Sequence, residues 1–107
     1  MGRKKHKHID YLKEFKKKLS EKFPIDKMIL FGSRATGRPY RWSDFDLIIV
    51  SSKFRKLDFF RRGARMYDYW DIDYPVDFLC YTPEEFKKLS KQITTVKEAV
   101  ETGIEIQ

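Results

Sequence analysis

Cysteine is nearly absent from this chain: only Cys80 occurs in 107 residues. A disulfide within the chain is therefore excluded, and no Cys/His spacing typical of a zinc site is present. Cys80 lies inside an apolar run with no histidine near it in sequence. We interpret it as a buried packing residue rather than as a nucleophile.

Long hydrophobic runs are also missing. No apolar stretch approaches the roughly 20 residues that a membrane-spanning helix needs. The basic start of the chain, residues 1–5, is not followed by the apolar segment of a secretory signal peptide. These absences predict a cytoplasmic location and no membrane partner.

Positive charge is abundant but unevenly distributed. The formal net charge is +7, with 13 Lys/Arg against 4 Asp/Glu in residues 1–43 and 10 against 12 in residues 44–107. Such asymmetry favours attraction to polyanions, either nucleotide phosphates or nucleic acid. A high net charge also serves solubility, so the charge alone does not identify a partner.

The apolar content is sufficient for one core. Hydrophobic residues make up 41% of the chain, including nine Phe, six Tyr and two Trp, and about 100 residues suit one domain. We therefore expect a single domain over residues 1–107. Residues 1–8 are expected as a flexible basic tail. A metal site at His6 and His8 is an alternative, which a mobile terminus disfavours.

The apolar periodicity predicts α/β material around a small mixed three-stranded sheet. Strands are expected at residues 28–31, 44–50 and 74–81, with a brief terminal strand at 104–106. Helices are expected at residues 10–23, 33–37, 53–70, 83–90 and between Thr94 and Gly103, and residues 38–42 are expected as a loop. At the fourth helix, Thr82, Pro83 and Glu85 form a capping-box pattern.

The expected helix at 53–70 carries more apolar surface than one face can bury. Two stripes lie side by side on it: Leu57, Phe60, Ala64 and Tyr67, and Phe59, Gly63, Met66 and Trp70. In so small a domain, part of the second stripe is expected to contact a partner.

Two aspartates stand at the head of an apolar strand. Asp44 and Asp46 are separated by one residue, so strand geometry puts both on the same face. Neighbouring carboxylates repel one another unless a cation neutralises them. Oxygen ligands of this kind suit Mg²⁺ or Mn²⁺.

A glycine–serine pair follows the strand at 28–31. Gly32 removes the side chain where another group must come close. Ser33 offers a hydroxyl, and a helix beginning here directs free N–H groups toward an anion. The pair therefore suggests the phosphate half of a metal–triphosphate site.

Two shared metal ions usually need a third carboxylate. Asp77 lies in the middle of the third expected strand, flanked by apolar residues, and is our first candidate. Asp73 is the second candidate, since it has the same strand parity.

These motifs together resemble the signature of the DNA polymerase β-like nucleotidyltransferase superfamily. The resemblance rests on residues 32–37 (GSRATG), five further residues, and residues 43–47 (SDFDL), with the later Asp77. It is closest to the minimal nucleotidyltransferase group, whose members are often paired with HEPN-domain proteins. The resemblance implies a nucleotidyltransferase fold.

The resemblance also implies a role for each matching residue. Gly32 and Ser33 would contact the triphosphate, and Asp44, Asp46 and Asp77 would hold two Mg²⁺ ions, with Mn²⁺ as an alternative. Many members have arginine where this chain has Thr36, and Arg34 is a candidate to supply that charge to the nucleotide.

The implied reaction is transfer of a nucleoside monophosphate, AMP from ATP, to a hydroxyl. The acceptor would be a tyrosine of a HEPN-domain toxin, with this chain as the antitoxin, or a second copy of the chain would complete the site. Two alternatives stay open: an idle module that neutralises its partner by binding alone, and a small basic nucleic-acid binder, which no recognised motif supports.

Overall fold

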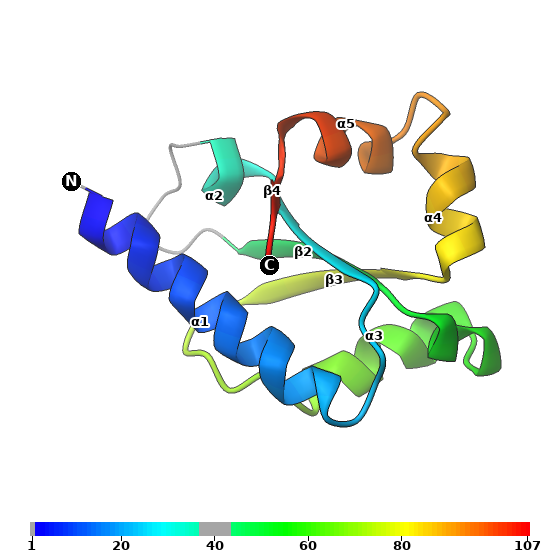
Figure 1. Cartoon of the computed structure of the whole chain (residues 1–107), viewed down its shortest axis with the longest axis horizontal. Helices are drawn as coiled ribbons and strands as arrows, with labels where there is room; N and C mark the ends of the chain where they lie inside the picture. The colour runs from blue at the N-terminus through cyan, green and yellow to red at the C-terminus, as the bar shows by residue number, and fades with distance from the viewer. Residues whose placement is uncertain (1, 37–43) are drawn as a thin grey trace.

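The computed structural model describes residues 2–36 and 44–107, with side chains from residue 8 onward, and Figure 1 shows the arrangement. The expected loop at 38–42, together with Gly37 and Ser43, lies outside the described residues. In chain order the elements are α1 (Gly2–Ser20), β1 (Lys27–Phe31), α2 (Ser33–Thr36), β2 (Phe45–Val50), the 3₁₀ helix η1 (Ser52–Lys56), α3 (Phe59–Tyr67), β3 (Val76–Tyr81), α4 (Pro83–Leu89), α5 (Thr95–Thr102) and β4 (Ile104–Glu105).

Within residues 2–36 and 44–107 the sheet has four strands, in the order β3-β2-β1-β4. Strands β2 and β3 run parallel, while β1 pairs antiparallel with both β2 and β4. The mixed sheet confirms the expected α/β class, but the expected count of three strands is wrong. The short β4 joins the edge of β1, where Ile104 pairs with Leu30.

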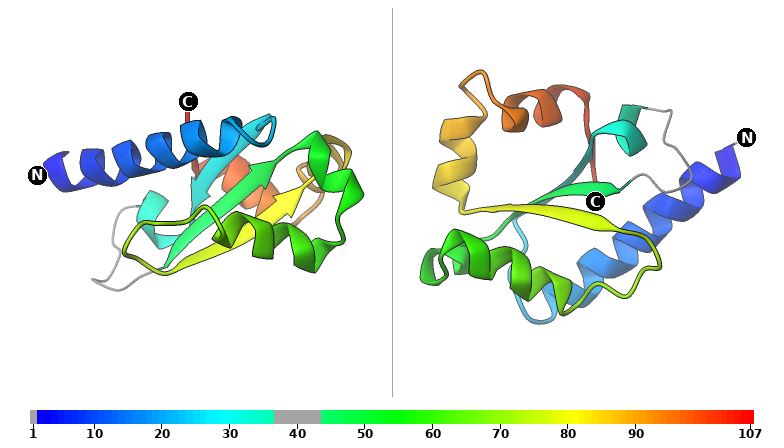
Figure 2. Two further views of the ribbon diagram at one scale, coloured as in Figure 1. Left: turned by 90° about the horizontal axis from the view of Figure 1, so that it is seen from below. Right: turned by 180° about the vertical axis from the view of Figure 1, so that it is seen from behind.

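Helices cover both faces of the sheet, as the views in Figures 1 and 2 agree. Helices α1 and α3 lie on one face, where an apolar cluster includes Leu12, Leu47 and Met66. Helices α4 and α5 lie on the other face, over a smaller cluster that includes Ile48 and Val96. The alternation along β2 therefore sends successive side chains to two different cores.

Two expected helices have different bounds in the structure. Helix α1 begins at Gly2, so the segment expected as a flexible tail is helical from residue 2 onward. The helix expected at 53–70 is two pieces, because the chain is extended at Leu57 and Asp58 between η1 and α3. The Asp58 side chain accepts a hydrogen bond from the Arg61 amide at 3.0 Å and so caps α3.

Only part of the second stripe is accessible in the structure. Met66, expected at a partner contact, is fully buried in the core. Trp70 packs edge-on against Phe15 in the same core. Phe59, the other aromatic residue of this stripe, is 48% exposed, and outside the stripe Phe60 is 86% exposed and Tyr67 50% exposed.

Several local predictions are confirmed. Thr82 and Glu85 form a reciprocal capping box with Pro83 in the first turn of α4, and Thr94 caps α5, which ends at Gly103. Cys80 is buried, and this burial raises the pKa of its thiol to about 12, with Arg62 acting in the opposite direction. The thiol is therefore protonated at neutral pH, as a packing residue should be. Within the described residues, no helix is both long and apolar enough to span a membrane.

A buried arginine joins α3 to the start of α4. Arg62 is only 7% exposed. Its guanidinium donates to the carbonyl oxygens of Leu57 and Cys80 and forms an ion pair with Glu85 at 2.6 Å. The Glu85 carboxylate also accepts a hydrogen bond from the Thr82 amide at 2.8 Å. One carboxylate therefore both completes the cap of α4 and pairs with Arg62.

Candidate functional site

Parallel pairing of β2 with β3 brings two of the candidate aspartates together. Asp46 and Asp77 are register partners in these strands. Paired residues of neighbouring strands point to the same face of a sheet, so both carboxylates lie on the face that α4 and α5 cover further along. Asp44 precedes β2 by one residue and is exposed.

Gly32 lies directly beside this pair, at the turn from β1 into α2. Its φ is +76°, a left-handed conformation that favours glycine. A Cβ at this position would collide with Oδ2 of Asp46. The glycine is therefore needed for the turn and for the approach of the Asp46 carboxylate to the backbone.

The electrostatics of the pair centre on Asp46. Burial raises the pKa of the Asp46 carboxyl above its ordinary value, and the negative charges of Asp77 and Asp44 raise it further. Asp46 thus interacts with both other carboxylates, and of the three it is the one that is half-buried.

Carboxylates in mutual repulsion fit a hard divalent cation by donor type and by charge. Across residues 2–36 and 44–107, however, no three Asp, Glu, His or Cys side chains are arranged so that they could hold one ion. The expected set of two ions on Asp44, Asp46 and Asp77 therefore stays a prediction.

The residues after Gly32 have different surroundings. Ser33 begins α2 and is exposed, and the Thr36 hydroxyl donates to the Gly32 carbonyl at 3.2 Å. Arg34 is 7% exposed, with its guanidinium 4.4 Å from the ring centre of Phe45 and 4.9 Å from that of Tyr74. Phe45 belongs to the core on the face opposite Asp46. The structure thus places the Arg34 guanidinium over two aromatic rings.

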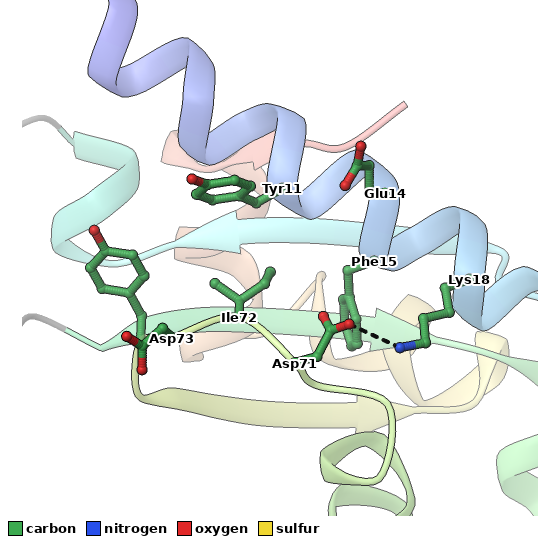
Figure 3. Close-up of a pocket in the computed structure, with 8 residues that line it drawn as sticks. Tyr11, Glu14, Phe15, Lys18, Asp71, Ile72 and Asp73 are labelled. Atoms are coloured by element: carbon green, nitrogen blue, oxygen red, sulfur yellow. Dashed lines mark hydrogen bonds and ion pairs between the residues drawn. The ribbon is translucent and has the colours of Figure 1, made fainter.

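Asp73, the second candidate for the third carboxylate, is elsewhere. It lies in the connection before β3 and lines a pocket of about 390 Å³ between that connection and α1. Figure 3 shows the pocket, with Asp71 and Lys18 joined across it by an ion pair of 3.1 Å. The register of β3 therefore selects Asp77 over Asp73 as the neighbour of Asp46.

Sequence reasoning missed the aromatic residues around the site. The rings of Phe45 and Tyr74 meet edge-on with their centres 5.6 Å apart, and the His8 ring of α1 packs against both. Tyr67 of α3 donates its hydroxyl to the Val76 carbonyl at 2.6 Å, and its pKa is raised by burial and then by Asp77 and Asp44. The only available signal was that Phe45 separates the two aspartates in sequence.

Residues 12–102 match the nucleotidyltransferase domain family. With the fold and the Gly32–Asp46–Asp77 arrangement described, the chain therefore belongs to that family and is a nucleotidyltransferase of the EC 2.7.7 type.

Individual relatives agree with this assignment. The chain is 33% identical over 79 residues to a protein of Haemophilus influenzae named "Probable protein adenylyltransferase MntA", covering 70% of this chain and 68% of that protein. A crystal structure of a protein from Sulfolobus solfataricus assigned as a nucleotidyltransferase has a TM-score of 0.66 at 22% identity. That match covers 94% of this chain and 80% of the other, and it supports the fold.

We predict that Gly32→Ala destabilises the protein and abolishes transfer. The left-handed φ alone costs an alanine about 1–2 kcal/mol, and the added methyl group must displace the Asp46 carboxylate. Urea unfolding and an AMP-transfer assay measure the two effects. Gly63→Ala is the control, because a Cβ there meets nothing within 4 Å and should stabilise α3 by roughly 0.5–1 kcal/mol. Equal stability of the two variants would contradict the turn geometry.

We predict that Asp46→Asn raises the melting temperature of the protein in EDTA at pH 7. A carboxyl whose folded pKa is raised stabilises the fold below its unfolded pKa, and this stabilisation is lost as pH rises through the folded value. The gain should be present at pH 7 and should shrink toward pH 4. Thermal unfolding of both proteins across this range measures it. A gain that is the same at both ends of the range would show that charge is not the cause.

Proposed function

We propose that this nucleotidyltransferase transfers AMP from ATP to a hydroxyl acceptor at the Asp44, Asp46 and Asp77 carboxylates. The observation that carries the proposal is the register pairing of Asp46 with Asp77 beside Gly32. Repulsion among carboxylates, with a raised pKa at Asp46, is an arrangement that a bound cation stabilises.

In the proposed reaction, the acceptor oxygen forms a bond to the α-phosphorus of ATP. The bond from that phosphorus to the oxygen bridging to the β-phosphate breaks, and pyrophosphate leaves. In this proposal Asp77 orients the acceptor hydroxyl and takes part in removal of its proton. Gly32 and Ser33 offer backbone and hydroxyl groups to the triphosphate at the start of α2.

Divalent metal ions belong to the chemistry of nucleotidyltransferases in general. In this chain Asp44, Asp46 and Asp77 would hold two Mg²⁺ ions, with Mn²⁺ as a substitute, because their oxygen atoms suit hard cations. The ions would supply charge neutralisation for the phosphates and the leaving pyrophosphate.

The acceptor is proposed to be a protein hydroxyl. The Haemophilus influenzae relative carries the name of a protein adenylyltransferase, and the described surface has exposed aromatic residues where a protein can dock. Phe59 and Phe60 at the start of α3 are flanked by exposed arginines, Arg61 and Arg65. We propose that this surface contacts a HEPN-domain toxin, one tyrosine of which receives AMP, so that the chain acts as an antitoxin.

The third aspartate is tested by substitution of Asp77, with Asp73 as the matched control. Asp77→Asn and Asp46→Asn should keep the fold, as measured by circular dichroism. Each should lower AMP transfer with Mg²⁺ and ATP by about 10²-fold or more, since each removes charge at the reacting phosphates. Asp73→Asn should retain activity, because Asp73 lines the pocket beside α1. Full activity in Asp46→Asn would overturn the site, and neutralisation of a partner without any AMP transfer would favour the idle antitoxin.

The docking surface is tested by Phe60→Ser. This side chain is 86% exposed, so its loss should leave stability within about 0.5 kcal/mol and weaken binding of the HEPN partner roughly tenfold or more. Isothermal titration measures the affinity. Ile93→Ser is the control, since Ile93 is fully exposed beyond α4. Equal binding by both variants would exclude this surface, and a dimer that Phe60→Ser dissociates would favour a second copy of the chain as the occupant.

A further inference from the structure

Arg34 is one of two arginines that are almost completely buried among the described residues, and it is the one next to the site. It follows Gly32 and Ser33 directly in the chain. Its guanidinium lies over the rings of Phe45 and Tyr74, at 4.4 and 4.9 Å. A cation within about 6 Å of a ring centre is attracted to the ring face, more strongly when water is excluded.

The two rings belong to the segments that carry the carboxylates. Phe45 stands between Asp44 and Asp46, so its ring fixes the first residue of β2. Tyr74 leads into β3, and the Pro75 carbonyl that follows it accepts the Phe45 amide at 2.9 Å. Arg34 itself extends from α2, the element that begins at the glycine–serine turn. One side chain therefore contacts all three segments that meet at the site.

We propose that Arg34 is a positioning residue for the nucleotidyl transfer, and that it acts by clamping α2 to the starts of β2 and β3. This inference rests on the proposed role of the carboxylates but goes beyond it. The clamp keeps the Gly32 turn against Asp46. The Asp46 carboxylate lies so close to Gly32 that a Cβ on this residue would collide with it. A shift of about 1 Å between the turn and the carboxylates is enough to cost two orders of magnitude in rate.

The planar guanidinium is suited to this position. It lies over two rings whose planes are inclined by 78° to one another, and it needs less hydration than an ammonium group. Lysine at this position would keep the charge but offer no plane to stack. Arg34→Lys should therefore resemble Arg34→Met, whereas a residue that only supplied charge to phosphate would be partly replaced by lysine.

Arg62 provides a matched control for burial and side-chain type. It is also 7% exposed, but it joins α3 to the α4 cap through Leu57, Cys80 and Glu85. Arg62→Met should lower the free energy of unfolding without moving the glycine–serine turn. A general effect of removing a buried arginine would appear in both variants.

The first measurement is amide hydrogen exchange in the protein without metal or nucleotide. The reporters are the Phe45 amide, bonded to Pro75, and the Ala35 and Thr36 amides, bonded to the Gly32 carbonyl. After correction for global stability from urea unfolding, Arg34→Met should speed exchange at these amides roughly tenfold. Phe45→Leu should do the same, and Arg62→Met should change them less than about twofold. Unchanged exchange in Arg34→Met would overturn the clamp.

The second measurement is steady-state AMP transfer. A positioning role predicts a fall in kcat of roughly tenfold or more with little change in the KM for ATP, for both Arg34→Lys and Arg34→Met. A raised KM with kcat retained, partly rescued by lysine, would identify direct phosphate contact and overturn the proposal. If the wild-type protein transfers no AMP, the proposed function fails, while the exchange measurement still decides the clamp.

Discussion

The parallel register of β2 and β3 is the constraint on which the candidate site depends. Parallel strands with aligned starts place Asp46 opposite Asp77, and a slip of one residue would send one of the two carboxylates to the opposite face. The apolar residues on both sides of the pair hold this register, because Leu47 and Phe78 pack in one core and Ile48 and Leu79 in the other. Burial of the hydrophobic residues thus determines where the charges meet.

The residues around the strand ends accommodate the repulsion between these carboxylates. Asp46 is half-buried, and its pKa is raised by that burial and by its acidic neighbours. At the turn, Gly32 has a left-handed backbone and no Cβ, and this leaves space for the Asp46 carboxylate. On the opposite face, the Arg34, Phe45 and Tyr74 contacts hold the same strand ends. Polar chemistry on one face is therefore supported by aromatic packing on the other.

The two helical layers have separate roles in this arrangement. Helices α1 and α3 cover the larger core, and α3 begins after the extended residues Leu57 and Asp58, with Met66 facing inward and Phe60 facing solvent. Helices α4 and α5 cover only part of the other face, over the cluster around Ile48. Asp46 and Asp77 lie on that same face, where the described chain leaves Asp77 exposed.

The sequence by itself determined the α/β class, most strands, the capping box at Thr82 and the choice of candidate carboxylates. These features depend on local periodicity and on side-chain chemistry at short spacing, which neighbouring residues settle. The role of Asp58 as the N-cap of α3 became clear only from its extended backbone in the structure. Strand β4 has only two residues, so the sequence did not predict that it pairs with β1 and adds a fourth strand to the sheet.

Tertiary structure alone showed that Asp77 is the register partner of Asp46 and that Arg34 lies over Phe45 and Tyr74. Both aspartates have the same parity in sequence, but only Asp77 lies within the paired part of β3. Arg34 is close in sequence to the turn, yet its guanidinium reaches rings that are 11 and 40 positions away in the numbering. Such contacts depend on strand register and on packing between distant segments, for which local periodicity carries no information.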